Sequence, residues 1–191
     1  DQVWSITTGW VDVNGDGNGE VEVAVIDTGV DVDHPDLAGN IKWCVSILNG
    51  VVSSNCNDGN GHGTHVIGTR AALSNGIGVV GVAPRVEVYA IKALRDDGSG
   101  SYSDIIMAID LAVKGPDGVI DADGDGVIVG DPQDDAPEVI SMSLGGYSDV
   151  PQLRQVIQAA YSWGITIVAA AGNEGYNYPA YPAAYPEVIA V

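Results

Sequence analysis

Short apolar runs rich in β-branched residues alternate along this chain with segments of helical periodicity. Strands are predicted at residues 21–27, 86–94, 138–144, 165–171 and 187–191, and helices at residues 62–73, 103–113 and 152–163. Strands that alternate with helices in this way indicate an α/β domain. The pattern therefore predicts a three-layer fold, with a mainly parallel central sheet and helices on both of its faces.

The helix predicted at residues 103–113 has the clearest apolar face. Ser103 is its expected N-cap, and the apolar face consists of Ile105, Ile106, Ile109 and Val113. The last predicted strand, by contrast, is an apolar run with no turn or helix cap after it. Because a buried strand needs neighbours on both sides, we expect residues 1–191 to be the N-terminal portion of a domain whose sheet continues beyond them.

Acidic side chains dominate the charge of the chain. It has 26 Asp and Glu residues against 7 Lys and Arg, which gives a formal net charge of −19. A surface of this sign repels nucleic acid and anionic membranes, so neither is an expected partner. No apolar run is long enough to predict a membrane helix, and a hydrophobic content of 46% is sufficient for one globular core.

The acids gather in two glycine-rich segments, residues 12–22 and 117–138. Each segment has a D-x-[DN]-x-[DN]-G pattern of oxygen ligands, formed by Asp12, Asn14 and Asp16 in the first and by Asp121, Asp123 and Asp125 in the second. Crowded carboxylates repel one another, which favours bound hard cations such as Ca²⁺. The alternative is a solvated acidic loop in each case.

Neither pattern is a complete EF-hand, because its twelfth position holds Val23 or Pro132 where an EF-hand has Glu. Other oxygen atoms are therefore expected to complete each cage. For the first loop the candidate is Glu20. For the second loop the candidates are the carboxylates of Asp117, Asp131, Asp134 and Asp135 and the carbonyl oxygens of Val119 and Val127.

The two cysteines, Cys44 and Cys56, are separated by a short loop rich in Ser, Asn and Gly. An even count and a short loop permit a disulfide, which would suit an oxidising compartment. Two reduced thiols are the other interpretation, because the sequence does not show whether the Cβ atoms come close enough.

Two polar residues stand where chemistry is expected in an α/β domain. Asp27 ends a buried strand and precedes a glycine turn, and the carboxyl ends of strands are where sites form in open sheets. His62 lies between two glycines at a predicted helix start, which leaves its imidazole accessible as a general base. Asp27 could then orient His62, although a carboxylate at this position could instead cap a turn or helix.

The remaining histidines suggest no chemistry of their own. His62 and His65 are three residues apart, and no Cys or Glu stands at the spacing of a zinc motif, so zinc binding is disfavoured. His65 and His34 are interpreted as structural. Asn173 follows a predicted strand and is flanked by glycine, so its amide could donate to a developing oxyanion; a turn-forming Asn is the alternative.

In combination, these segments resemble the subtilisin-like serine proteases over essentially the whole chain. The matching motifs are D-T-G-V-D-V-D-H-P-D-L, N-G-H-G-T-H-V-I-G-T, S-M-S-L-G-G and A-G-N-E-G, in this order. An aspartate followed by a histidine, with the serine later, is the order of the subtilisin triad. The resemblance is strongest toward the calcium-dependent extracellular subtilisins of hyperthermophilic archaea.

The resemblance implies a role for each residue of this constellation. His62 would accept the proton of a nucleophilic serine, Asp27 would hold His62 in the required tautomer, and Asn173 would stabilise the oxyanion. The chain has no Gly-Thr-Ser-Met-Ala run, so the serine is expected outside it and residues 1–191 alone are expected to be inactive. A secreted, monomeric, heat-stable endopeptidase of broad specificity is implied, with protein substrates and a pro-segment outside this chain.

The resemblance also implies a substrate cleft and a further calcium site. Two backbone edges would clamp an extended peptide by strand addition, with an apolar pocket wall beside them, although the same glycines could simply form turns. The cleft residues are Gly98, Ser99, Gly100, Ser143, Leu144, Gly145, Ala170 and Gly172. The calcium ligands would be Asp36, Leu73, Asn75, Ile77 and Val79. A peptide-binding member without the serine and a calcium-binding structural module are the alternative functions.

Overall fold

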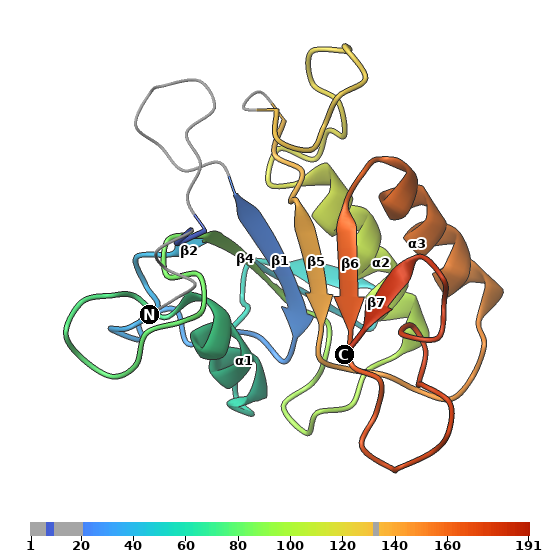
Figure 1. Ribbon diagram of the computed structural model, residues 1–191, viewed down its shortest axis with the longest axis horizontal. Helices are drawn as coiled ribbons and strands as arrows, with labels where there is room; N and C mark the ends of the chain where they lie inside the picture. Colours follow the sequence, from blue (N-terminus) through green and yellow to red (C-terminus); the bar gives the residue numbers. More distant parts are fainter. Residues whose placement is uncertain (1–6, 10–20, 132–133) are drawn as a thin grey trace.

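The computed structural model describes residues 7–9, 21–131 and 134–191 (Figure 1). The strands are β1 (Glu22–Asp27), β2 (Ile41–Leu48), β3 (Val51–Ser53), β4 (Glu87–Lys92), β5 (Val139–Met142), β6 (Thr166–Ala169) and β7 (Val188–Ala190). The helices are α1 (His62–Ala71), α2 (Tyr102–Lys114) and α3 (Pro151–Ser162). Within these residues the strands form one sheet in the order β3-β2-β4-β1-β5-β6-β7, in which the β2–β3 pair is antiparallel and the other pairs are parallel.

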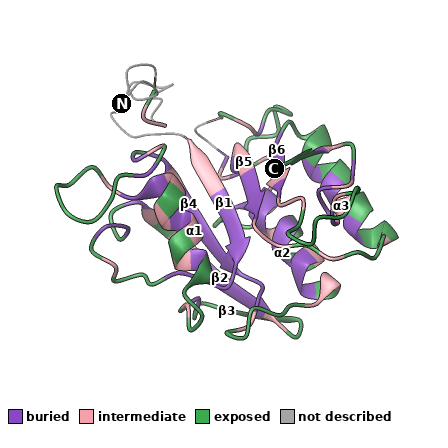
Figure 2. Ribbon diagram, turned by 60° about the horizontal axis from the view of Figure 1, so that its bottom comes forward, coloured by how far each residue is buried: buried purple, intermediate pink, exposed green. Residues whose placement is uncertain are grey.

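Helices cover both faces of this sheet. α1 packs on one face against β1 and β4, while α2 and α3 contact each other on the opposite face (Figure 1). Successive side chains of a strand point to opposite faces, so Val25 joins the cluster that contains Ile67, whereas Ile26 joins the cluster that contains Ile109. The central strands are buried between the helices (Figure 2). The predicted α/β fold, with a mainly parallel sheet and helices on both faces, is confirmed.

A β-hairpin is present that the hydrophobic pattern did not predict. β2 runs beside β4 and returns through Asn49 and Gly50 into β3. These two residues have φ angles of 55° and 74°, and a two-residue hairpin turn with positive φ at both positions favours the sequence Asn-Gly. The Asn-Gly pair was therefore the signal for this hairpin.

α2 begins one residue before its predicted start, and its N-cap is Ser101 rather than Ser103. The hydroxyl of Ser101 accepts a hydrogen bond from the backbone N–H of Asp104 at 3.1 Å, which satisfies a donor that the helix itself leaves free. Ser103 lies in the first turn, and its hydroxyl pairs with that of Ser101 at 2.9 Å. Ile105 and Ile109 of the predicted face are buried, while Ile106 is partly buried against the same core.

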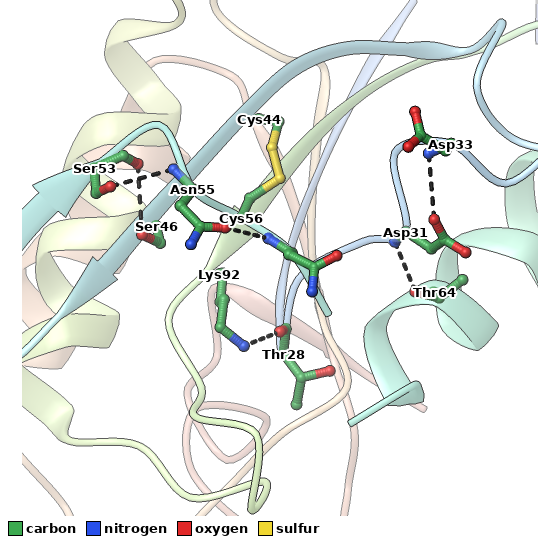
Figure 3. The surroundings of a disulfide bond; sticks show 11 residues. Thr28, Asp31, Asp33, Cys44, Ser46, Ser53, Asn55, Cys56, Thr64 and Lys92 are labelled. Carbon is green, nitrogen blue, oxygen red and sulfur yellow. Dashed lines mark hydrogen bonds between the residues drawn. A yellow bond between two sulfur atoms is a disulfide. The ribbon is translucent and has the colours of Figure 1, made fainter. Parts of the chain in front are cut away.

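Cys44 and Cys56 form a disulfide with a Cα–Cα distance of 5.7 Å (Figure 3). The bond joins β2 to the segment that follows β3 and so closes the base of the hairpin. The carbonyl oxygen of Cys56 also accepts the backbone N–H of Val30 at 3.0 Å. The disulfide therefore anchors the segment that leads into α1 beside the turn that follows β1. None of the described helices is long and apolar enough to cross a membrane.

Candidate active site

Parallel strands place their carboxyl ends at one edge of the sheet, and the loops that follow β1, β4 and β5 meet there. A cavity of about 420 Å³ opens between these loops. Six of the residues singled out in the sequence line it: His62, Gly98, Gly100, Ser143, Leu144 and Gly145. The structure thus brings both predicted cleft edges and the predicted base to one cavity.

His62 and Asp27 are in direct contact. The Nδ1 atom of His62 lies 2.7 Å from Oδ1 of Asp27, and the same oxygen accepts the backbone N–H of Thr28 at 2.6 Å. The Asp27 side chain is 1% exposed, whereas that of His62 is 48% exposed. With Asp27 ionised, Nδ1 carries the proton of this bond, and Nε2 is left as a free base on the exposed edge of the ring.

Glycine on both sides of His62 allows this contact. Gly61 has a φ of 95°, in the left-handed region that favours glycine, and α1 begins directly after it. Gly63 lies so close to the turn after β1 that a Cβ atom would collide with the carbonyl oxygen of Gly29. The first turn of α1 can therefore approach the end of β1, which brings the ring of His62 to Asp27.

Two cationic side chains near Asp27 were missed at the sequence stage of reasoning. Lys92 is 5% exposed and donates to the carbonyl oxygen of Thr28 (Figure 3) and to Oδ1 of Asp96, the latter at 2.6 Å. Arg70 is half-buried and donates to Ser143 Oγ at 3.4 Å. Burial lowers the pKa of Arg70, and the negative charge of Asp27 opposes this shift. A Lys inside the apolar run Val-Tyr-Ala-Ile-Lys-Ala-Leu was the sequence signal for Lys92.

Asn173 lies in the exposed loop after β6, outside the cavity that His62 lines. Its backbone N–H donates to Oε2 of Glu174 at 2.9 Å, and the same carboxylate accepts the hydroxyl of Tyr147. That hydrogen bond lowers the pKa of Glu174 and raises the pKa of Tyr147 to about 12. Tyr147 packs against Tyr176 and Tyr178 at ring distances of 5.1 and 5.9 Å. An aromatic cluster therefore supports the loop that carries Asn173.

The three other predicted cleft residues lie beside the cavity rather than on its wall. Ser99 is exposed, and its N–H and hydroxyl donate to Oδ1 of Asp97 at 2.8 and 2.6 Å. Ala170 and Gly172 follow β6, where Ala170 N–H donates to the carbonyl oxygen of Met142 at 3.1 Å. This bond holds the end of β6 against the strand that leads into Ser143.

The family is decided by comparison with known proteins. The model of the subtilase family, a peptidase family, matches residues 18–191. The chain belongs to the subtilase family. It is 43% identical over 185 residues to subtilisin DY of Bacillus licheniformis, covering 95% of this chain and 59% of the relative. It is 44% identical over 178 residues to subtilisin E of Bacillus subtilis, covering 90% and 40%.

A solved structure agrees with this assignment. Sphericase superposes on this subtilase with a TM-score of 0.75 and 40% sequence identity, over 90% of this chain and 52% of that chain. The chain thus spans about half the length of the relatives it matches. The predicted resemblance to subtilisin-like serine proteases is confirmed, and so is the subtilisin-like fold.

Asp36 of this subtilase is arranged to hold a cation. It is 3% exposed, and its Oδ1 atom is buried without a hydrogen-bond partner among the described residues. Its Oδ2 accepts the N–H of Val79 at 2.9 Å and its carbonyl oxygen accepts the N–H of Leu73 at 2.9 Å, which places the predicted loop around it. In the same loop, Oδ1 of Asn75 accepts the N–H of Ile77 at 3.1 Å. A calcium ion would satisfy the free oxygen of Asp36.

The second acidic loop contains two groups of carboxylates whose oxygen atoms lie within 4.8 Å of one another. Asp134 is 8% exposed, and its Oδ2 is buried without a hydrogen-bond partner among the described residues. The N–H of Ala122 lowers the pKa of Asp134, but desolvation and neighbouring carboxylates outweigh it, so that this pKa is raised. The two groups are Asp121, Asp123 and Asp134, and Asp123, Asp125 and Asp131.

The remaining predicted ligands of this loop lie outside both groups. Asp117 instead accepts the N–H of Val119 at 2.8 Å. Val119 and Val127 are exposed, and Asp135 is half-buried beside Gly115. The first predicted loop, with Asp12, Asn14, Asp16 and Glu20, lies outside the residues that the structure describes.

Proposed function

We propose that this chain is the N-terminal portion of the catalytic domain of a secreted, calcium-stabilised serine endopeptidase of broad specificity. The observation that carries the proposal is the 2.7 Å contact between His62 Nδ1 and the buried carboxylate of Asp27, beside a cavity wide enough for a peptide. Membership of the subtilase family and the similarity to named subtilisins support it.

His62 acts as the general base in this proposal. Its Nε2 takes the proton from the attacking serine and later returns it to the leaving amine, while the charge of Asp27 stabilises the imidazolium that forms. Asn173 donates its side-chain amide to the oxyanion of the tetrahedral intermediate. The nucleophilic serine belongs to a segment outside residues 1–191, in keeping with relatives of which this chain spans 40% to 59%.

The substrate binds as an extended strand between residues 98–100 and residues 143–145. Backbone hydrogen bonds to these two edges give affinity that does not depend on the substrate sequence, which suits a broad specificity. Leu144 and Leu153 make part of the cavity wall apolar, and Ala170 and Gly172 extend this wall. The substrates are proteins, and the enzyme is a monomer made with a pro-segment.

Calcium has a structural role in this proposal. The buried free oxygen atoms of Asp36 and Asp134 support two separate sites, one in the loop at residues 73–79 and one in the loop at residues 117–135. When bound, the ion supplies the positive charge that these carboxylates lack. The disulfide between Cys44 and Cys56 supports an extracellular location, because such bonds persist in oxidising compartments.

A fluorophosphonate probe applied to the complete gene product tests this function. We expect covalent labelling of one serine and hydrolysis of unfolded casein, both abolished in His62→Ala. Residues 1–191 alone should show neither. Calcium or peptide binding without labelling of the complete protein would contradict the endopeptidase and indicate a binding module. Hydrolysis by residues 1–191 alone would contradict the placement of the serine.

A further inference from the structure

The helix that carries His62 lacks a capping side chain of its own. α1 starts at His62, and its N-cap residue is Gly61, which makes no side-chain cap. The first turn also contains no acidic residue. The first backbone N–H groups of a helix have no partner within it, and they carry a partial positive charge. Another part of the chain must therefore satisfy the start of α1.

Asp58 does this from the loop that precedes the helix. Its Oδ1 accepts the backbone N–H groups of Asn60 at 3.1 Å and of Gly61 at 2.9 Å. Its Oδ2 accepts both the backbone N–H and the hydroxyl of Thr64, at 2.9 and 2.7 Å. Through these four bonds one carboxylate holds the residues on either side of His62.

A fifth bond connects Asp58 to the other member of the pair. The hydroxyl of Thr28 donates to Oδ1 of Asp58 at 2.8 Å and accepts the backbone N–H of Gly63 at 2.9 Å. The backbone N–H of Thr28 donates to Oδ1 of Asp27, the oxygen that His62 contacts. A continuous hydrogen-bond network thus runs from Asp58 to Asp27 and to the start of α1.

We propose that Asp58 is a positioning residue for the His62–Asp27 pair: its carboxylate holds the first turn of α1 against the turn after β1 at the distance that proton transfer requires. This inference rests on the proposed function of His62 as general base. Side chains that support a site in this way keep its reacting groups within a fraction of an ångström of the productive geometry. Asp58 does not line the cavity, so it is not expected to contact substrate.

The ionisation of Asp58 is consistent with this role. Desolvation raises the pKa of its carboxyl group, but hydrogen bonds from Thr64, Gly61 and Thr28 outweigh that effect and lower the pKa to about 2. The carboxylate is therefore charged at every pH at which His62 is neutral. The negative charge also complements the positive end of the helix.

The first test is Asp58→Asn in the complete enzyme. The amide keeps the size of the side chain but loses the charge and turns one acceptor into a donor that faces Thr64. We expect kcat to fall about 10- to 100-fold, the scale of a small misplacement of reacting groups, while KM changes less than about threefold. Asp110→Asn, which removes an exposed carboxylate from α2, is the matched control and should leave both constants unchanged.

A second pair of variants keeps the inference testable if Asp58→Asn does not fold. Thr64→Val removes the hydroxyl that bonds Asp58, whereas Thr64→Ser retains it. We expect Thr64→Val to lower kcat in the same direction as Asp58→Asn and Thr64→Ser to restore it. Since both changes act on one network, their effects in the double variant should be smaller than the product of the single effects.

A spectroscopic measurement separates this inference from the proposed function. The proton between His62 Nδ1 and Asp27 gives a strongly downfield NMR signal, which does not depend on turnover. We expect the signal to shift or broaden in Asp58→Asn and to stay unchanged in Asp110→Asn. An unchanged signal together with an unchanged kcat would overturn the role of Asp58 while leaving His62 as the base. Failure of wild-type labelling by fluorophosphonate would overturn the proposed function instead.

Discussion

The two side chains of the His62–Asp27 pair lie in opposite environments. The carboxylate of Asp27 is almost fully buried, and nearly half of the imidazole of His62 is exposed. A buried carboxylate is costly unless hydrogen bonds and nearby cations compensate it. The N–H of Thr28 and the ring of His62 supply hydrogen bonds to Asp27, and the cation of Arg70 lies close enough to interact with it. The exposed edge of the ring is left for chemistry.

Asn173 provides a prediction at the residue scale. Its side chain is exposed, and the proposed bond to the oxyanion matters only as negative charge develops, so Asn173→Ala should lower kcat without raising KM. We expect a loss of about 10²- to 10³-fold, the size measured for an oxyanion-hole donor in subtilisin. Steady-state kinetics of the complete enzyme check this. Asn177→Ala, in the same exposed loop, is the control, and equal kcat values for the two variants would remove Asn173 from the mechanism.

The position of α1 against β1 depends on contacts between elements. The helix begins where Gly63 meets the turn that contains Gly29, and the hydrogen bonds of Asp58 and Thr28 close the same junction. On the other side of that turn, the backbone of Cys56 bonds Val30. Because these contacts come from four separate segments, the geometry of the candidate site belongs to the junction rather than to any one motif.

Gly63→Ala tests this junction. Alanine normally stabilises a helix interior by about 1 kcal/mol relative to glycine. At Gly63, however, the new methyl group would collide with the carbonyl oxygen of Gly29, and overpacking costs about 1–3 kcal/mol. We expect lower stability and lower kcat in the complete enzyme, measured by denaturant unfolding and steady-state kinetics.

Gly68→Ala is the control, because its methyl group would meet Leu37 at 4.0 Å, an ordinary contact. It should keep or raise stability. If Gly63→Ala were as stable as Gly68→Ala, the close approach of α1 to β1 would not be required.

The amino-terminal ends of β1 and β5 provide a prediction about pH. Burial, then the charge of Glu138 and the hydrogen bond to it, then the charge of Glu87 raise the pKa of Glu22 from 4.5 to about 9. Between these values the folded protein keeps a proton that the unfolded chain has lost, so stability should fall as pH rises from about 5 to about 9. Glu22→Gln should flatten this dependence.

Thermal unfolding of the complete protein across this pH range measures the effect. Asp110→Asn removes an exposed carboxylate and should leave the dependence as it is in the wild type. A Glu22→Gln curve parallel to that of the wild type would show that Glu22 does not keep its proton on folding.

For the whole molecule, excess negative charge is the main electrostatic problem, and bound calcium is the proposed answer. An ion that binds only the folded state stabilises it by about 2.7 kcal/mol at a hundredfold excess over its dissociation constant. We therefore expect chelation to lower the unfolding temperature of the complete protein. Asp121→Asn combined with Asp123→Asn should reduce the dependence on calcium.

The control for charge alone is Asp33→Asn combined with Asp110→Asn, which removes two exposed carboxylates outside the proposed sites. It should keep the dependence of the wild type. Magnesium should replace calcium poorly, because it demands a tighter octahedral shell and keeps its waters. A wild-type unfolding temperature that chelator does not change would contradict structural calcium.

Much of this molecule could be predicted because the signals were local. The five strands and three helices follow from apolar periodicity, and the glycines around Asp27 and His62 mark the places where backbone segments approach closely. The β2–β3 hairpin was missed because its strands are short and β3 is exposed, which leaves little hydrophobic pattern. Its Asn-Gly turn was a local signal that periodicity does not include.

The amino-acid sequence by itself determined the elements, the family and the identity of the pair at the carboxyl edge of the sheet, because each depends on residues close together in the chain. Only the tertiary structure decided the disulfide, the unsatisfied oxygen of Asp36, the buried position of Lys92 and the network around Asp58. These depend on which distant segments the sheet order brings side by side, and a hydrogen bond or a disulfide forms only when both partners arrive within a few ångströms.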